Sequence, residues 1–420
     1  LFDDATLNEL MPRVEVGNQN LAQMVANVAQ AQAMLRQAEA GRWPTLGVDL
    51  SGGRSGKPAR GSADVGASAS WSPDLWGDLA DAVRAQAANV QASEADLAAA
   101  RLSAQGSFAQ GYFSVREMDA ELALLGDIIA GYEQAEKMTQ NRYDNGIIAH
   151  TDLLQAQSTL ASARASRIQL AASRAASEHA LALLLGLAPA DFSLPPAPWT
   201  ATVPPIPASL PSDLLLRRPD IASAERAVAA ANARIGVARG AYFPNIGLTA
   251  SAGGTASGLS RIFSASTLMW SLGLSVAQTL FDAGARAGAV EQAKAQHDAA
   301  TAGYRQSALD AMGQVEDSLT NLAALAGQIE QTRIASEAAQ GAAERMMNSY
   351  QAGLSAYTDV VTAQASALNA SRSLLQLRSQ RQQAAVGLIQ ALGGGWTAPW
   401  AEAPVSGAQD SLATLPAEHG

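Results

Sequence analysis

The sequence predicts a mainly helical protein with a smaller β portion, arranged as two tandem repeats. Three observations predict this mixed α and β fold class. Two very long stretches, 74–188 and 245–398, contain no proline, which permits very long helices. Short runs that begin near residues 45 and 245 alternate apolar with small or polar side chains, as strands do. Finally, segments of the sequence recur at a spacing of roughly 200 residues.

The internal repetition divides the chain into two repeats and a linker. The segment AEAGRWPTLGVDLSGG (38–53) resembles ARGAYFPNIGLTASAG (238–253), and RYDNGIIAHTDLLQAQ (142–157) resembles SYQAGLSAYTDVVTAQ (349–364). Prolines concentrate between the repeats, and we interpret that segment as a linker. The predicted domains are repeat 1 at 1–188, the Pro-rich linker at 189–219, repeat 2 at 220–392 and a C-terminal tail at 393–420.

After an initial short helix and a β-hairpin, each repeat contains one very long helix and a shorter helix that returns along it. Apolar residues from Met118 to Tyr132, and again from Met312 to Leu322, are spaced by four and three, which indicates a coiled-coil seam. Each long helix is expected to extend ~100 Å at 1.5 Å per residue. Turns at Gly146 and Gly353 reverse the chain. The predicted helices of the two repeats lie at about 78–144, 151–185, 285–351 and 358–392.

β-Hairpins are predicted at about 44–72 and 245–281. Leu46, Val48 and Leu50 alternate with small or polar residues, and each run has the ~10-residue length of a tilted transmembrane strand. Soluble hairpins with one buried face would give the same alternation. The membrane interpretation is favoured because one face is wholly apolar and because aromatic residues occur at the same end of every strand, as in an interfacial belt. These aromatic residues are Trp43, Trp76, Tyr242, Phe243 and Phe281.

The number of strands predicts an oligomer. Four strands cannot close a membrane barrel, since the smallest have about eight. An open sheet edge cannot lie in lipid, because its backbone groups would have no hydrogen-bond partners. Several chains must therefore share one barrel. Three protomers would supply twelve strands and a coaxial tube of long helices.

Composition and motifs exclude several classes of function. The net charge of −10 and the pI near 5.0 argue against nucleic acid as a partner, because no basic stripe displaces counterions. The sequence has no cysteine, its four histidines lack metal-ligand spacing, and no nucleophile-elbow or phosphate-loop motif is present. We therefore predict no enzyme activity, no cofactor and no metal site. No apolar run reaches the ~20 residues of a transmembrane helix.

The layout of the repeats resembles the TolC/OprM (NodT-type) outer-membrane efflux proteins. The likeness is most specific in LPSDLLLRRPDIASAE (210–225), and it extends to FPNIGL (243–248), TLFDAG (279–284), both YxxG turns and the closing ALGGGW (391–396). It implies a homotrimer with a twelve-stranded β-barrel in outer-membrane lipid and a helical barrel that crosses the periplasm. The linker and the tail would form an equatorial girdle. The chain begins at Leu1 without an initiator Met, so we expect a mature or trimmed product. Members of the family often begin at a lipid-modified cysteine, so the resemblance implies a lipoprotein, and whether such a cysteine precedes Leu1 stays open.

The resemblance also implies a function. The chain would be the exit duct of a tripartite efflux system, and it would passively conduct drugs, toxic small molecules or ions, as in multidrug resistance. Its partners would be a periplasmic adaptor, or membrane fusion protein, and an inner-membrane transporter, commonly of the resistance-nodulation-division class. Two alternatives remain weaker. A soluble coiled-coil scaffold leaves the alternating strands unexplained, and an enzyme on a helical bundle lacks a site.

Functional residues are expected at the two helix tips. The residues that flank Gly146 and Gly353 would dock the adaptor, although the geometry of the turns alone also explains both glycines. The resemblance implies a gate in which Tyr350 forms a hydrogen bond with Asp152 and in which Asp359 forms a ring of three carboxylates.

The alternative for both aspartates is the ordinary stabilisation of a first helical turn by an acidic side chain. The sequence departs from the family at two gate positions: an arginine that helps the latch is replaced by Ser355, and a second ring aspartate is replaced by Thr362. A weak gate is therefore expected.

Overall fold

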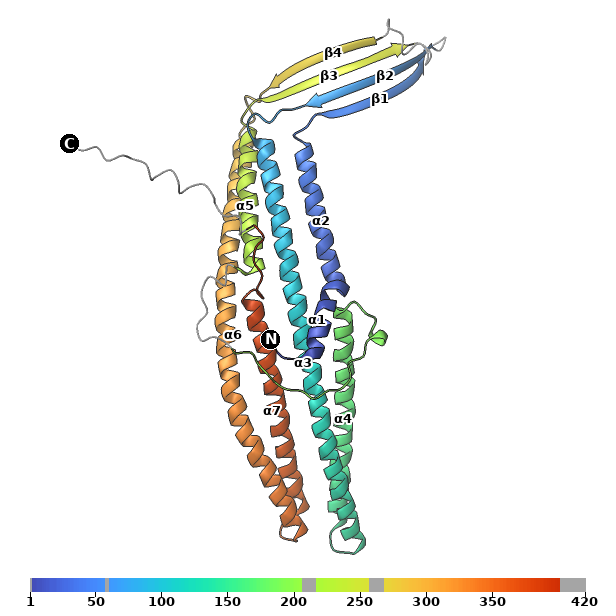
Figure 1. Cartoon of the computed structure of the whole chain (residues 1–420), viewed down its shortest axis with the longest axis vertical. Coiled ribbons are helices and arrows are strands. Elements are labelled where there is room, and N and C mark those ends of the chain that lie inside the picture. Colours follow the sequence, from blue (N-terminus) through green and yellow to red (C-terminus); the bar gives the residue numbers. More distant parts are fainter. Residues whose placement is uncertain (1, 57–59, 206–216, 257–267, 401–420) are drawn as a thin grey trace, which may run out of the picture. The chain divides into compact units, whose positions relative to one another are not determined.

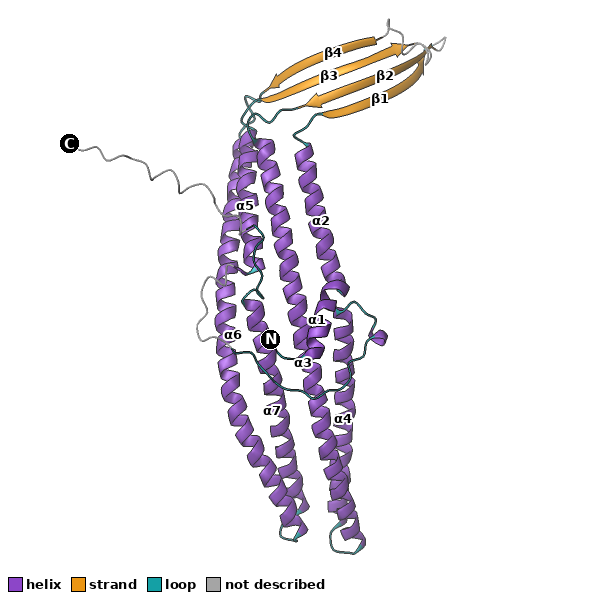
Figure 2. Cartoon of the chain, in the orientation of Figure 1, coloured by secondary structure: helices purple, strands orange, loops and turns teal. Residues whose placement is uncertain are grey.

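The computed structural model describes residues 2–56, 60–205, 217–256 and 268–400. Helices dominate and one antiparallel sheet is present, which confirms the predicted mainly helical fold class with a smaller β portion (Figures 1 and 2). The elements are α1 (Ala5–Gly17), α2 (Gln19–Ala40), β1 (Thr45–Ser55), β2 (Arg60–Trp71), α3 (Asp78–Asp144), α4 (His150–Leu184), the short 3-10 helix η1 (Pro189–Asp191), α5 (Pro219–Gly240), β3 (Asn245–Ala256), β4 (Leu268–Ala277), α6 (Ala285–Gln351) and α7 (Tyr357–Ala391).

The chain forms two compact units, and each unit draws on both of the predicted repeats. Unit 1 comprises Leu1–Gln23, Ala98–Pro219 and Leu309–Gly420, and it contains both helix tips. Unit 2 comprises Met24–Leu97 and Asp220–Ala308, and it contains the sheet. Residues 206–216 of the predicted linker and 401–420 of the predicted tail lie outside the described residues.

The long helices α3 and α6 have 67 residues each. Along the seam of α3, Leu125, Ile129 and Tyr132 are buried. On α6, Val315 and Leu322 are buried, whereas Met312 is exposed. Packing of these seams replaces water around apolar side chains, which is the main source of stability for helices of this length. No helix among the described residues combines the length and the apolar character needed to cross a membrane.

Where the sequence predicts one initial helix, the structure has two. Asn18 separates α1 from α2, and its carbonyl oxygen Oδ1 accepts the backbone N–H groups of Asn20 and Leu21, at 2.9 and 3.3 Å. Asn18 Nδ2 also donates to the backbone oxygen of Leu184, at the end of α4. The break thus satisfies the free N–H groups at the start of α2, as an N-cap does.

The sheet has the strand order β1-β2-β3-β4, and all neighbouring strands are antiparallel. The register pairs Leu46 with Ala69 and Ala252 with Trp270, so apolar residues from all four strands lie on one face. Asp49 pairs with Gly66 and Ser251 with Ser271, so polar and small residues lie on the opposite face. Each face collects every second residue of its strands.

Candidate functional sites at the helix tips and on the sheet

Both helix tips end in the same backbone turn. Gly146 and Gly353 have φ angles of 70° and 76°, in the left-handed region that glycine adopts without strain. At the first tip, the N–H of Ile147 donates to the carbonyl oxygen of Arg142, and at the second the N–H of Leu354 donates to that of Ser349, at 2.9 Å in both. This is the Schellman arrangement, which satisfies carbonyl groups at a helix end.

The residue after each of these glycines is apolar and exposed. The exposed fraction is 63% for Ile147 and 82% for Leu354. A Cβ added to Gly146 or Gly353 would meet no atom within 4 Å, so the glycines are explained by their backbone conformation rather than by crowding. The two tips therefore present matching apolar side chains to the surroundings.

Asp152 and Asp359 lie in the first turns of α4 and α7. The residues that precede these helices are Ala149 and Ala356, which provide no side-chain cap. A carboxylate in the first turn favourably faces the positive end of the helix dipole. Asp359 is exposed, whereas Asp152 is partly buried.

The predicted hydrogen bond between Tyr350 and Asp152 is absent from the described chain. Tyr350 is 4% exposed, and its hydroxyl group has no hydrogen-bond partner among the described residues. Its ring instead packs edge-on against Tyr357, with 5.2 Å between the ring centroids, in a cluster that includes Ala156 and Val360. Packing against Tyr357 fixes the position of the Tyr350 ring, and in this position the hydroxyl group does not bind Asp152.

Arg142 contacts the second tip and was missed by reasoning from the sequence. Its Nη1 donates to the backbone oxygen of Tyr350 at 3.0 Å, and its guanidinium carbon lies 4.9 Å from the centroid of the Tyr350 ring. A basic residue in the last turn of a helix, directly before the YDNG turn, is the signal that was available.

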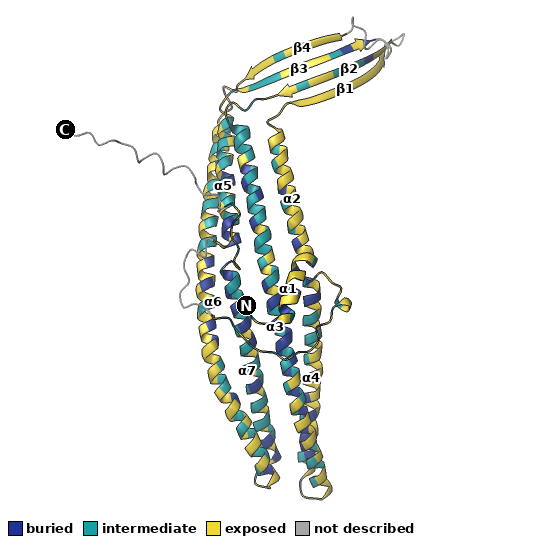
Figure 3. Cartoon of the chain, viewed as in Figure 1, coloured by how far each residue is buried: buried dark blue, intermediate teal, exposed yellow. Residues whose placement is uncertain are grey.

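The residues of the outer strands β1 and β4 are mostly exposed (Figure 3), and they include the large side chains of the apolar face of the sheet. Large side chains on the outer strands are exposed, such as Leu46 at 84% and Trp270 at 78%. On the polar face, the Asp64 carboxylate accepts from Thr255 at 2.6 Å and from Ser51 at 3.3 Å. An apolar face of this extent is not left in water by stable soluble proteins, so it marks an interaction surface.

The predicted aromatic residues occur at one end of the sheet, because β1 and β3 begin where β2 and β4 finish. The rings of Trp76 and Phe243 stack at 5.0 Å, and Trp76 Nε1 donates to the backbone oxygen of Pro244 at 2.7 Å. The guanidinium group of Arg286 lies over the Tyr242 ring. The remaining two, Trp43 and Phe281, are exposed.

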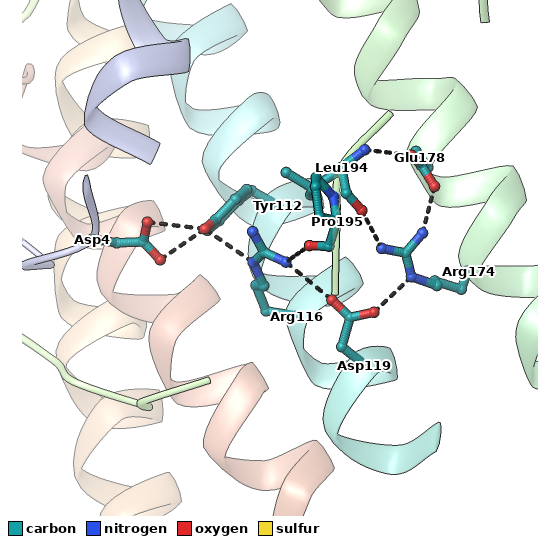
Figure 4. Close-up of polar contacts among 8 residues, drawn as sticks. All are labelled: Asp4, Tyr112, Arg116, Asp119, Arg174, Glu178, Leu194 and Pro195. Carbon is teal, nitrogen blue, oxygen red and sulfur yellow. Dashed lines mark hydrogen bonds and ion pairs between the residues drawn. The ribbon is translucent and has the colours of Figure 1, made fainter. Parts of the chain in front are cut away.

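A buried ionic network anchors the start of the linker in unit 1 (Figure 4). Asp119 accepts hydrogen bonds from Arg116 at 3.1 Å and from Arg174 at 2.6 Å. The two arginines also donate to the backbone oxygens of Pro195 and Leu194, respectively. This network connects α3 and α4 to the segment that follows η1.

The network continues to the start of α1. The Tyr112 hydroxyl donates to the Asp4 carboxylate at 2.8 Å and accepts from Arg116 Nε at 3.0 Å. Burial raises the pKa of Tyr112. The Asp4 carboxylate also caps α1 by accepting the N–H of Leu7. No group of histidine, cysteine and acidic residues that could hold a metal ion occurs in the described part of the chain.

The chain is similar to known outer-membrane proteins over nearly its whole length. It is 31% identical over 407 residues to the cation efflux system protein CusC of Escherichia coli CFT073, covering 94% of this chain and 87% of CusC. It is 29% identical over 401 residues to the probable outer membrane lipoprotein SilC of Salmonella typhimurium, with coverage of 94% and 87%.

Solved structures of outer-membrane proteins are also similar to this chain over nearly its whole length. A crystal structure of CusC superposes with a TM-score of 0.86 at 30% identity, covering 94% of this chain and 93% of that one. The outer membrane protein VceC of Vibrio cholerae superposes with a TM-score of 0.84 at 28% identity, with coverage of 94% and 98%.

The family described as outer membrane efflux protein matches residues 10–187 and 210–394. These matches make the chain an outer-membrane efflux channel and a transport protein rather than an enzyme, which confirms the predicted function and location. With its helices, its sheet and most of its length matched, this chain belongs to the outer membrane efflux protein family.

Proposed function

We propose that three copies of this chain assemble into one continuous duct. Each copy would contribute four strands to a twelve-stranded transmembrane β-barrel and its long helices to a periplasmic α-helical barrel. The observation that carries this proposal is the sheet of unit 2, whose apolar face is exposed and whose outer strands β1 and β4 each have an open edge. In lipid, the backbone groups of an open edge need partners from another chain.

Lipid contact explains the composition of the exposed face. Fully removing a side chain such as Leu46 or Leu272 from water contributes ~1.5–3 kcal/mol. The aromatic residues at the end of the sheet would lie at the membrane interface, where one side of a ring meets lipid and its polar atom meets water. A soluble scaffold would leave this face in water, which argues against that alternative.

The oligomeric state can be tested directly. Light scattering of the detergent-solubilised protein, with the detergent mass subtracted, should give a trimer. Because the chain has no cysteine, introduced pairs provide a clean second assay. Ser51→Cys on β1 with Ser271→Cys on β4 should give covalent trimers with a short bismaleimide, whereas either single variant should give none. A monomer or dimer in both assays would contradict the proposal.

We further propose that the two tips dock a periplasmic adaptor, which connects the duct to an inner-membrane transporter of the resistance-nodulation-division class. The exposed apolar side chains after Gly146 and Gly353, which are Ile147 and Leu354, support this role. Leu354→Asp should abolish copurification with the adaptor and preserve the trimer. The matched control is Val16→Asp, which changes another exposed apolar residue away from the tips. Equal loss in both variants would contradict tip docking.

For the gate, we propose that Asp152, Tyr350 and Asp359 line the narrow end of the helical barrel. Threefold symmetry would bring three copies of the exposed Asp359 around one axis. A ring of carboxylates favours cations over anions. Reversal potentials in a salt gradient should therefore be less cation-selective for Asp359→Asn than for wild type. Identical reversal potentials would mean that Asp359 only stabilises the first turn of α7.

Metal cations are the substrate class that we propose first, alongside drugs and other toxic small molecules. Two observations support cations: the name of CusC, and the carboxylates of Asp49 and Asp64 on the face that would line the barrel. A strain without its own duct should regain tolerance to metal salts when it expresses this chain with a matching pump and adaptor. Restored tolerance to antibiotics alone would favour a drug-exporting system.

Two finer features complete the proposal. The linker segment 189–205 would form part of an equatorial girdle, and this is supported by the hydrogen bonds from Gln382 on α7 to the backbone oxygens of Thr200 and Thr202. A lipid anchor on a cysteine that precedes Leu1 is supported by the name of SilC. Metabolic labelling of the full-length protein with a fatty acid tests for the anchor.

A further inference from the structure

We propose that Arg142 is the residue that holds the second helix tip in the closed position, through the backbone and ring of Tyr350 rather than through the Tyr350 hydroxyl. The inference rests on the proposed trimeric duct and its gate. Two contacts define it: Arg142 Nη1 donates to the Tyr350 backbone oxygen at 3.0 Å, and the guanidinium group lies 4.9 Å from the ring centroid. The Tyr350 hydroxyl makes no hydrogen bond in the described chain.

The position of Arg142 at two helix ends explains why a cation is favourable there. Arg142 lies in the last turn of α3, and Tyr350 lies in the last turn of α6. The C-terminal end of a helix carries partial negative charge on its free carbonyl groups. Arg142 therefore belongs to the last turn of one 67-residue helix and binds a carbonyl group in the last turn of the other. α6 itself has no basic residue in its last turn.

The accepting carbonyl group belongs to the turn that ends α6. The Tyr350 oxygen also accepts the N–H of Gly353 at 3.0 Å, as the Schellman arrangement requires. A carbonyl oxygen can accept two hydrogen bonds, so the bond from Arg142 adds to the turn and does not compete with it. Arg142 thus connects the end of α3 to the residue that fixes the second tip.

The ring contact extends this connection into the packing of the tips. The Tyr350 ring packs against Tyr357 at the start of α7, and the same cluster includes Ala156 of α4. A guanidinium group over an aromatic face is attracted by the negative charge of that face. Arg142 therefore contacts a cluster in which α4, α6 and α7 meet, and its removal would loosen the two hairpins from each other.

The second repeat has no residue that could form the equivalent contact in the opposite direction. The counterpart of Arg142 in the second repeat is Ser349, which has no positive charge. Each protomer has this contact at one tip only, and a trimer would have three. No carboxylate in the described part of the chain forms an ion pair with Arg142, so the carbonyl group and the ring are what the guanidinium group binds here.

The test compares three variants of the full-length channel in planar lipid bilayers. Arg142→Ala removes both contacts and should shift the closed-to-open equilibrium roughly tenfold towards the open channel, a factor that corresponds to ~1.4 kcal/mol. Arg142→Lys retains the charge and a donor but not the planar group, so it should restore part of the closed state. Tyr350→Phe retains the ring and the backbone carbonyl group and should conduct like wild type. This last expectation separates the proposal from a latch that uses the hydroxyl.

The matched control is Arg164→Ala, which removes an exposed arginine that pairs with Glu133 at 2.7 Å. It should conduct like wild type. Size-exclusion profiles of all variants show whether the trimer is intact. If Tyr350→Phe opens the channel and Arg142→Ala does not, the hydroxyl holds the tip and the proposal is wrong. Equal opening by Arg142→Ala and Arg164→Ala would overturn it too. A wild-type protein that forms no channel would refute the proposed duct itself.

Discussion

The buried carboxyl group of Glu117 contributes stability that this protein should lose as the pH rises towards neutrality. Glu117 lies on α3, is 8% exposed, and its Oε1 has no hydrogen-bond partner among the described residues. Burial and the nearby charge of Glu121 raise the pKa of Glu117 from 4.5 to about 7, although Arg372 opposes the shift. Glu121 itself is compensated, because its carboxylate pairs with Arg372 at 2.5 Å.

The sign and the size of the effect follow from this shift. The folded protein binds the proton of Glu117 more tightly than the unfolded chain does, so its contribution to stability is complete below pH 4.5 and is lost as the pH rises to about 7. The difference between the two pKa values, at 1.36 kcal/mol per unit, amounts to ~3 kcal/mol per chain. Glu117→Gln retains the shape and removes the titration, so this variant should not lose that stability.

The assay is thermal unfolding of the purified protein, followed by circular dichroism between pH 5 and pH 8. The unfolding temperature of wild type should fall by a few degrees relative to Glu117→Gln over this range, since the unfolding entropy of a 420-residue chain makes ~1 kcal/mol equivalent to ~1 °C. The control is Glu133→Gln, which changes an exposed carboxylate in a surface ion pair. Parallel pH profiles for wild type and Glu117→Gln would refute the reasoning.

Three further changes should have distinct effects. Gly353→Ala forces a residue with a Cβ into a φ of 76° and should lower the free energy of unfolding by ~1 kcal/mol, measured by denaturant titration. Asp119→Asn leaves Arg116 without its buried ionic partner and should cost ~3–5 kcal/mol in the same titration; a loss below ~1 kcal/mol would show that the network is dispensable. Leu272→Arg places a charge on the exposed apolar face and should cost ~2–4 kcal/mol of membrane stability, whereas Ser271→Arg on the opposite face should cost less. Equal amounts of both variants in the outer membrane would contradict the assignment of the two faces.

The sequence predicted those features that depend on short-range patterns. The absence of proline and the four-three spacing of apolar residues indicated α3 and α6, and strict alternation indicated the strands. These patterns reflect the geometry of one helix or one strand, so they can be recognised without knowledge of its neighbours. The break at Asn18 was not predicted, because its cap depends on side-chain hydrogen bonds and on a contact with Leu184, far along the chain.

The contacts of the proposed gate residues were harder to predict because they join distant segments of the chain. The resemblance to the family suggested that Tyr350 would bind Asp152, but it did not show that the tyrosine ring would be buried against Tyr357. The buried network around Asp119 was also missed. Arg116 and Asp119 are three residues apart on one helix, but Arg174 and the linker carbonyl groups come from other parts of unit 1.

The two tips have different side-chain contacts on the same backbone turn. Both tips have a left-handed glycine, the same pair of turn hydrogen bonds and a tyrosine three residues before the glycine. At the first tip, Tyr143 is exposed, and its ring lies tilted against that of His150, with 4.9 Å between the ring centroids. At the second, the matching residues are Tyr350 and Tyr357, which are buried against each other. A buried tyrosine presents its backbone carbonyl group and its ring face at a fixed place, where a neighbouring arginine can bind both. The backbone turns are thus the shared framework, and the side chains in which the two segments differ determine which tip binds the arginine.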